Sequence, residues 1–201
     1  PIVSEESETL AENCQAAATS KLYWLVDPLD GTKEFVAGNG EYTVNIALIA
    51  DKKPYLGVIH VPEQNCGYLG LGSGGAWRQD QATRSEITTR RADPDAPHFA
   101  LSRSHARNEG EELKRLWPQC TIHQTGSSLK LCQVANREAD IYFRRTPTSI
   151  WDIAAGHAIV QGAGGTVTKL DGEALLYDPL QRINPPLLAL GDPSFDMSRL
   201  G

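Results

Sequence analysis

The sequence contains no long hydrophobic run and few cysteines, and each shortage excludes a class of protein. No apolar stretch approaches the roughly 20 residues of a membrane-spanning helix, and no signal peptide is recognisable. The cysteines, Cys14, Cys66, Cys120 and Cys132, lie far apart, without the spacing of a zinc site or the density of a disulfide framework. We therefore expect reduced thiols in a cytoplasmic protein.

Positive charge is also scarce, with 19 lysines and arginines against 25 acidic residues and a formal net charge of −6. Binding to a nucleic-acid backbone needs clustered cations, so we expect no nucleic-acid partner. A small anionic substrate stays compatible with this charge, because bound metal ions can reverse the local field. The 201 residues, 40% hydrophobic and 22% charged, can bury the core of a globular protein.

The most informative stretch is residues 24–35, which read WLVDPLDGTKEF. The apolar residues 23–26 predict a buried strand, so Asp27 would lie at its carboxyl end. The proline after it favours an extended conformation at Asp27. The Asp30–Gly31 pair suits a turn, and residues 32–35 can begin a helix.

This expected turn places two carboxylates, Asp27 and Asp30, and the Leu29 carbonyl beside the free N–H groups of a helix start. Carboxylate and carbonyl oxygens are the ligands that Mg²⁺ takes, and a helix N-terminus binds phosphate. An isolated Asp-Pro-x-Asp-Gly is most often an acidic surface turn. The motif alone therefore leaves the two interpretations evenly matched.

Two kinds of pattern divide the chain near residue 95. Residues 1–95 hold short strands joined by Gly, Pro and Asp turns, which predicts an antiparallel meander. The expected strands are 1–3, 23–26, 42–49, 56–61, 67–71, 76–78 and 85–90. The glycine run at 70–75 lacks a following helix, so we interpret it as hairpin turns and not as a phosphate loop.

Beyond an expected linker at 92–97, strands alternate with helices, which indicates an α/β layer. The expected helices are 108–117, 127–139 and 151–161, and the expected strands are 99–102, 121–124, 141–143, 165–170 and 187–190. We predict an α+β protein with an antiparallel-sheet metal and phosphate subdomain, 1–95. An α/β substrate-binding subdomain, 96–201, follows it.

Three segments together resemble the Mg²⁺-dependent, lithium-sensitive phosphatase superfamily that includes the inositol monophosphatases. They are the DPLDGT turn, an upstream SEES at 4–7 and a downstream WDIAAG at 151–156, in the family's order. The KEF continuation, SRSH at 102–105 and GSSLK at 126–130 are most similar to the 3′(2′),5′-bisphosphate nucleotidase branch, the CysQ type. Inositol phosphatases more often carry Asn in place of Glu34.

The resemblance implies a shared site for two or three Mg²⁺ ions, with inhibition by Li⁺. Its ligands would be Glu5, Asp27, Asp30, Asp152 and the Leu29 carbonyl. Carboxylates packed so closely repel one another unless divalent cations neutralise them. Asp152 alone would be an ordinary helix N-cap, but its membership of this set favours a metal role.

The implied reaction is metal-assisted, in-line hydrolysis of a phosphomonoester. Catalytic roles fall on Glu5, Thr32 and Asp30. Glu5 would position or deprotonate the attacking water, and the Thr32 hydroxyl would orient that water. The Gly31 and Thr32 backbone N–H groups would hold the phosphate oxygens.

The resemblance also implies which residues line the nucleotide and its second phosphate. Besides Gly31 and Thr32, they are His105, Ser127, Lys130, Arg144 and Asp152. Arginine and lysine suit a distal phosphate, although taken singly Lys130 and Arg144 are more often solvated cations, and His105 a loop histidine. Strand alternation would place Arg144 and Arg145 on opposite faces. Arg144 is assigned to the substrate because it matches the family's position.

The chain begins inside the acidic motif, whereas family members carry helices before this point, with an aspartate that helps to activate the water. We therefore expect a fragment or truncated form without these N-terminal helices. The implied fold is the layered α/β/α/β sandwich of the inositol monophosphatase and fructose-1,6-bisphosphatase type.

The first functional interpretation is a phosphatase that converts adenosine 3′,5′-bisphosphate (PAP) to AMP and phosphate in sulfur assimilation. Conversion of PAPS to APS is left open as an additional reaction. The alternatives are an inositol or other sugar phosphatase, and a catalytically impaired fragment that binds nucleotide and metal. The expected partner is a small nucleotide bisphosphate. Peripheral association with the cytoplasmic face of the inner membrane and the oligomeric state are left open.

Overall fold

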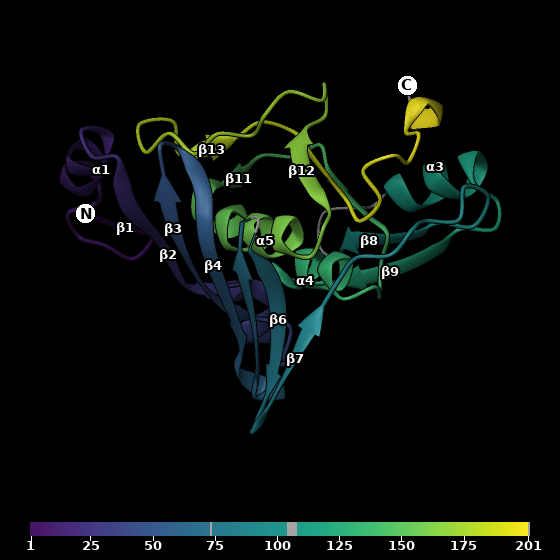
Figure 1. Ribbon diagram of the computed structural model, residues 1–201, viewed down its shortest axis with the longest axis horizontal. Helices are drawn as coiled ribbons and strands as arrows, with labels where there is room; N and C mark the ends of the chain where they lie inside the picture. Colours follow the sequence, from purple (N-terminus) through teal and green to yellow (C-terminus); the bar gives the residue numbers. More distant parts are fainter. Residues whose placement is uncertain (73, 104–107, 201) are drawn as a thin grey trace.

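The computed structural model describes residues 1–72, 74–103 and 108–200. Two sheets and the helices between and beyond them form alternating layers (Figure 1). Helix α5 (Ile150–Gly162) packs on the larger sheet, and α4 (Leu129–Ala135) lies between α5 and the smaller sheet. On the far side of the smaller sheet lies α3 (Glu109–Leu116). The predicted layered α+β sandwich is therefore confirmed.

The larger sheet has seven strands in sequence order, all from the first half of the chain. They are β1 (Ile2–Ser4), β2 (Leu22–Asp30), β3 (Thr43–Ala50), β4 (Lys53–Val61), β5 (Cys66–Leu71), β6 (Gly75–Asp80) and β7 (Thr83–Ile87). Strand β1 runs parallel to β2, and each later neighbour is antiparallel. The predicted meander is confirmed, and the glycine run lies at the β5–β6 hairpin as expected.

Strand β2 extends further than the sequence predicted. We expected it to end at Val26, but its pairing with β3 continues to Asp30 across an irregularity between Asp27 and Asp30. A bulge of this kind bends the strand and redirects its side chains. The two aspartates are therefore held by sheet pairing, and not by a free turn.

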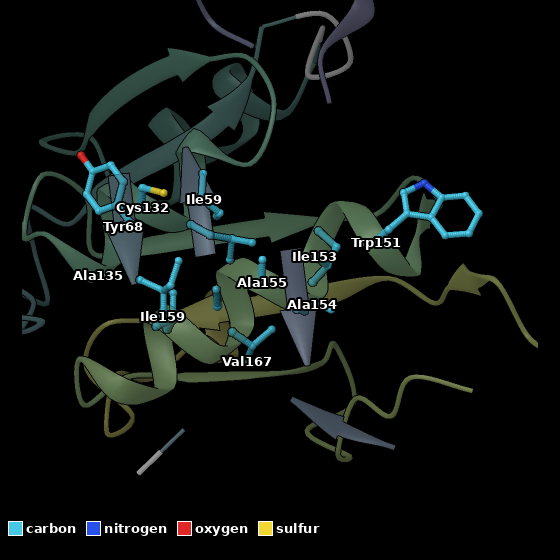
Figure 2. Close-up of a cluster of buried hydrophobic side chains, with 14 of the residues drawn as sticks. Ile59, Tyr68, Cys132, Ala135, Trp151, Ile153, Ala154, Ala155, Ile159 and Val167 are labelled. Carbon is cyan, nitrogen blue, oxygen red and sulfur yellow. The ribbon is translucent and has the colours of Figure 1, made fainter. Parts of the chain in front are cut away.

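Two glycines let α5 approach the larger sheet closely. A Cβ atom at Gly57 would lie 2.1 Å from the Ala155 carbonyl oxygen, and one at Gly70 would lie 2.4 Å from the Ile159 Cα. No side chain fits in that space, so the helix backbone lies almost directly on the sheet. Figure 2 shows Ala155 and Ile159 in one buried cluster with Ile59 of β4.

The smaller sheet has the strand order β12-β14-β10-β8-β9. Its strands are β8 (His98–Ser102), β9 (Thr121–Thr125), β10 (Ile141–Arg144), β12 (Thr166–Lys169) and β14 (Leu187–Leu190). Strands β8, β9 and β10 are parallel, with α3 and α4 as the crossover helices, while β14 and β12 add antiparallel pairs. This is the α/β layer that the second half of the sequence predicted.

The remaining elements are short. They are α1 (Leu10–Ala18), α2 (Thr32–Ala37), the two-stranded sheet of β11 (Thr148–Ser149) and β13 (Ile183–Asn184), and the 3₁₀ turns η1 (Pro62–Gln64) and η2 (Ser198–Leu200). No helix among the described residues combines the length and apolar character required to cross a lipid bilayer. The expected linker at 92–97 is irregular chain between β7 and β8. The division into subdomains at residue 95 stays a prediction.

The helix predicted at 127–139 was wrong at both ends. Ser127 and Arg137 have φ angles of 47° and 66°, in the left-handed region that a right-handed helix does not contain. Helix α4 therefore occupies only Leu129–Ala135. The apolar periodicity located the helix but did not reveal these two turns.

The face of the larger sheet that points away from α5 is also apolar. A row of paired residues crosses it from β2 to β6: Val26, Ile46, Val58, Leu69 and Trp77. The side chains in this row are half-buried or exposed, and Trp24 beside them is 36% exposed. We call this surface the outer face of the larger sheet.

Candidate metal and phosphate site

Three acidic side chains from distant segments meet at one end of the larger sheet. One carboxylate oxygen from each of Glu5, Asp27 and Asp152 lies within 4.8 Å of the others. The parallel pairing of β1 with β2 continues into a Glu5 N–H bond to the Val26 carbonyl (3.2 Å), which places Glu5 beside Asp27. Asp152 arrives from the first turn of α5.

Asp30 lies next to this group, but hydrogen-bond donors of the protein surround one oxygen of its carboxylate. Its Oδ2 atom accepts hydrogen bonds from the Ser128 N–H (2.7 Å), the Asn45 Nδ2 (3.2 Å) and the Thr43 hydroxyl (3.5 Å). The negative charge of Asp30 raises the pKa values of Asp27 and Asp152. The four predicted acidic ligands therefore share one neighbourhood, in which Asp30 is anchored by donors from both halves of the chain.

The acidic cluster holds its carboxyl groups at high pKa values. Burial, followed by the charges of Asp30, Glu5 and Asp152, raises the pKa of Asp27 to about 8. Burial and the charge of Asp30 raise the pKa of Asp152 to about 7, and burial also raises the pKa of Glu5. A divalent cation would relieve this repulsion, and an all-oxygen donor set suits a hard cation such as Mg²⁺.

Asp152 has a structural role at the start of α5 and a place in the acidic cluster, but it is not the N-cap that it would have been on its own. Its Oδ2 accepts the Ser149 N–H at 2.8 Å and so completes a capping box at the start of α5. The same side chain belongs to the three-carboxylate group. The N-cap is Ser149 and Asp152 is the N3 residue, so the N-cap interpretation of Asp152 was wrong, while its side chain both caps the helix start and belongs to the acidic cluster.

The turn that follows Asp30 is built around a glycine and a short helix. Gly31 has a φ angle of +87°, which glycine adopts readily, and α2 begins at Thr32. The Thr32 hydroxyl donates to the Leu29 carbonyl at 3.4 Å, and the Leu29 N–H donates to Asp27 Oδ1 at 3.0 Å. A carbonyl oxygen has a second lone pair, so this contact leaves Leu29 able to act as a ligand.

A cavity of about 270 Å³ opens beside the acidic residues. All but one of the residues predicted to bind substrate line it, and they come from both halves of the chain: Gly31, Thr32, Ser127, Lys130, Arg144 and Asp152, with Asp30. The exception, His105, lies outside the described residues. Glu5 lines a neighbouring cavity of about 630 Å³ with Trp151 and Arg182.

Lys130 is buried, so its interpretation as a solvated cation was wrong. Only 4% of the residue is exposed, and its Nζ donates to the carbonyls of Thr125 (3.4 Å) and Ser127. Burial lowers its pKa to about 8, while the charge of Asp30 opposes that shift. The ammonium group thus fixes the turn before α4 and also faces the cavity.

Arg144 and Arg145 have different surroundings, as strand alternation predicted. Arg144 lines the cavity, and its Nε donates to the Thr146 carbonyl at 3.2 Å. Arg145 instead forms a bidentate ion pair with Glu112 of α3, at 2.6 and 3.1 Å. The substrate-binding role of Arg144 stays a prediction.

Sequence reasoning missed the residues that hold Asp30 in place. Thr43 and Asn45 occupy inward positions of β3 and are almost fully buried. Ser128 binds the same carboxylate, and its hydroxyl also contacts Thr43 and Asn45, each at 2.8 Å. Polar residues at inward positions of an otherwise apolar strand were the signal that could have identified them.

Comparisons with known proteins agree with this geometry. The model of the inositol monophosphatase family matches residues 1–189. The 3′(2′),5′-bisphosphate nucleotidase CysQ of Escherichia coli K12 is 46% identical over 189 residues, which is 92% of this chain and 73% of the relative. The Buchnera aphidicola protein of the same name is 42% identical over 185 residues, 92% of this chain and 68% of the relative.

A solved structure of the same family is also similar to this chain. The crystal structure of CysQ from Bacteroides thetaiotaomicron, a bacterial member of the inositol monophosphatase family, superimposes with a TM-score of 0.83 at 35% identity. The match covers 94% of this chain and 76% of the other. The similarity therefore includes nearly every element that builds the acidic cluster and the cavity.

Proposed function

Because this chain belongs to the inositol monophosphatase family, we propose that it is a Mg²⁺-dependent 3′(2′),5′-bisphosphate nucleotidase. It hydrolyses PAP to AMP and phosphate in sulfur assimilation, and the PAPS-to-APS reaction belongs to the same proposal. Its similarity to the curated CysQ nucleotidases supports this substrate class. We propose that the reaction takes place in the cytoplasm.

One structural observation carries the proposal: an acidic cluster adjoins a cavity that also contains buried positive charge. Asp152 belongs both to the Glu5–Asp27–Asp152 group and to the lining of the cavity, which Lys130 and Arg144 also line. A bisphosphate substrate has one phosphate to be cleaved and another to be recognised. Lysine and arginine suit the recognised phosphate, whereas the carboxylates would repel the other phosphate unless a cation lay between them.

The oxygen donors fit bound Mg²⁺. Glu5, Asp27, Asp30, Asp152 and the Leu29 carbonyl would hold two or three ions, and Li⁺ inhibition follows from the same assignment. When bound, the metal supplies Lewis-acid catalysis and lowers the pKa of water.

The chain's own groups bind and orient the reactants. Glu5 positions the attacking water and accepts its proton, and the Thr32 hydroxyl orients that water. The Gly31 and Thr32 N–H groups bind oxygens of the reacting phosphate. Lys130, Arg144 and Ser127 bind the nucleotide side of the substrate, and His105 has the same assigned role.

A direct comparison of substrates tests the proposal. Phosphate release is measured with PAP and with inositol 1-phosphate, each with Mg²⁺ and with EDTA. The expected result is Mg²⁺-dependent turnover with a higher kcat/KM for PAP. Faster hydrolysis of inositol 1-phosphate would instead assign an inositol phosphatase. Binding of PAP and Mg²⁺ by calorimetry without turnover would indicate a binding fragment.

A further inference from the structure

An ion pair joins the two halves of the chain behind the wall of the cavity. Arg103, directly after β8 of the smaller sheet, donates from Nε and Nη2 to the two carboxylate oxygens of Glu41, at 2.8 and 2.6 Å. Glu41 lies just before β3 of the larger sheet. A third bond, from Arg103 Nη2 to the Gln124 carbonyl (2.8 Å), fixes the guanidinium against β9.

The same carboxylate also holds the turn that leads into the cavity wall. Glu41 Oε2 accepts the Gly126 N–H at 2.8 Å. A Cβ atom at Gly126 would lie 3.0 Å from the Glu41 carbonyl oxygen, and one at Gly31 would lie 3.2 Å from that atom. Glu41 is therefore packed against both glycine turns that border the cavity.

The turn held by Glu41 positions groups of the candidate site. Its last residue, Ser128, donates its N–H to Asp30 at 2.7 Å. Ser127 has a φ angle of 47°, a strained value for a residue with a side chain, so surrounding contacts must maintain it. A small movement of this turn would shift Asp30 and the cavity wall together.

The contact differs from an ordinary surface ion pair. The Arg103 side chain is 46% exposed, but that of Glu41 is only 20% exposed and accepts two hydrogen bonds from Arg103 and one from a backbone N–H. Arg103 and the Gly126 N–H lower the pKa of Glu41, so the carboxylate stays ionised at any neutral assay pH. Loss of its charge would weaken three hydrogen bonds at once.

We propose that Glu41 and Arg103 form a latch that positions the Gly126–Ser128 turn for substrate binding. Neither side chain lines the cavity, so both are positioning residues. The expected effect on catalysis rests on the proposed nucleotidase function. The expected effect on the Gly126–Ser128 turn rests only on the hydrogen bonds and packing described above.

Kinetics test the catalytic part. Glu41→Gln and Arg103→Lys are each expected to raise the KM for PAP about tenfold, with kcat changed less than about threefold. The matched control is Glu112→Gln, which removes the charge from another bidentate pair, Arg145–Glu112, and should leave KM unchanged. An unchanged KM in Glu41→Gln, or an equal increase in the control, would overturn the latch.

A double-mutant cycle tests whether Glu41 and Arg103 act through their shared contact or affect KM independently. Combining Glu41→Gln with Arg103→Gln should raise KM hardly more than either single change, because each already breaks the same contact. Multiplicative effects would show that the two residues act separately, which contradicts the latch.

Amide hydrogen exchange tests the turn without relying on turnover. With Mg²⁺ and inorganic phosphate present, the Gly126 and Ser128 amides should exchange about tenfold faster in Glu41→Gln than in wild type or Glu112→Gln. If wild type fails to hydrolyse PAP but this acceleration is seen, the nucleotidase proposal fails and the latch stands. Unchanged exchange at both amides rejects the latch, whatever the activity.

Discussion

The side chain of His157 is hydrogen-bonded to the Tyr177 hydroxyl inside the core, with Nδ1 and the oxygen 2.9 Å apart. The Tyr177 carbonyl in turn accepts the hydroxyl of Tyr23 on β2. Burial lowers the pKa of His157 to about 4, so the imidazole is neutral in the folded protein at pH 7. This chain of contacts ties α5 to the larger sheet.

Acid should therefore destabilise the fold through His157. Its folded pKa is depressed below the unfolded value near 6.5, so the unfolded state binds more protons between about pH 6.5 and 4. The stabilisation is complete above pH 6.5 and is lost as pH falls through this window, by at most about 3 kcal/mol. Urea unfolding at pH 7 and pH 4.5 should show a smaller acid loss in His157→Gln than in wild type, and equal losses would contradict the prediction.

The carboxylate cluster predicts the opposite pH trend in metal-free protein. The pKa of Asp27 is raised to about 8, so the folded state binds more protons than the unfolded state between about pH 4 and 8. Stability should fall as pH rises through this window, and Mg²⁺ should restore it. Melting temperatures measured with EDTA and with Mg²⁺ should therefore differ more at pH 8 than at pH 5.

Asp27→Asn is the control for that experiment, because it removes one charge from the cluster. The variant should melt higher than wild type in EDTA at pH 8 and gain less from Mg²⁺. A wild-type protein whose melting temperature responds equally to Mg²⁺ at both pH values would show that the cluster does not bind the ion.

Metal-dependent turnover should depend on Asp27 and Asp30. Replacing either by Asn is expected to lower kcat/KM for PAP by about a thousandfold or more, since each change removes charge where the cation is held. Asp178→Asn, which breaks the distant Lys52–Asp178 pair of 2.7 Å, should have little effect. Retained activity in Asp30→Asn would exclude it from the catalytic machinery.

The two adjacent arginines offer a matched test of substrate recognition. Arg144→Ala should raise the KM for PAP about 10- to 100-fold, because the second phosphate loses a charge-assisted bond. Arg145→Ala should leave KM within about threefold, because Arg145 is paired with Glu112 and does not line the cavity. An equal rise in both variants would place recognition elsewhere.

Gly57→Ala should destabilise the protein by about 2 to 4 kcal/mol, because the added Cβ would lie 2.1 Å from the backbone of α5. Gly67→Ala is the matched control, with its nearest atom 3.7 Å away, and should change stability by less than about 1 kcal/mol. Chemical denaturation measures both. Similar free energies of unfolding for the two variants would show that α5 can move away from the sheet without loss of stability.

The sequence was informative where short motifs, in the right order along the chain, resembled those of a known family. The motif around Asp27, with Glu5 and Asp152, identified the side chains that the structure brings together. Strand alternation separated Arg144 from Arg145 correctly. The DPLDGT motif alone left two interpretations open, and only its combination with the motifs around Glu5 and Asp152 selected the acidic set.

What the sequence did not reveal depends on contacts between distant segments. Nothing local showed that Ser128 would bind Asp30, 98 positions away. Lys130 is buried among the layers around α4, and the left-handed residue Ser127 follows Gly126, which packs against Glu34 and Glu41. Such features are set by tertiary packing, which overrides the periodicity of a single helix.

The outer face of the larger sheet has a practical consequence for work in solution. Ile46 within the row that ends at Trp77, and Trp24 beside it, are exposed and make this face an apolar surface in contact with water. Apolar surfaces in contact with water favour contact with other proteins or with membranes, and aggregation. Variants of this chain should therefore be compared at one low protein concentration in one buffer, so that self-association or adsorption is the same for all.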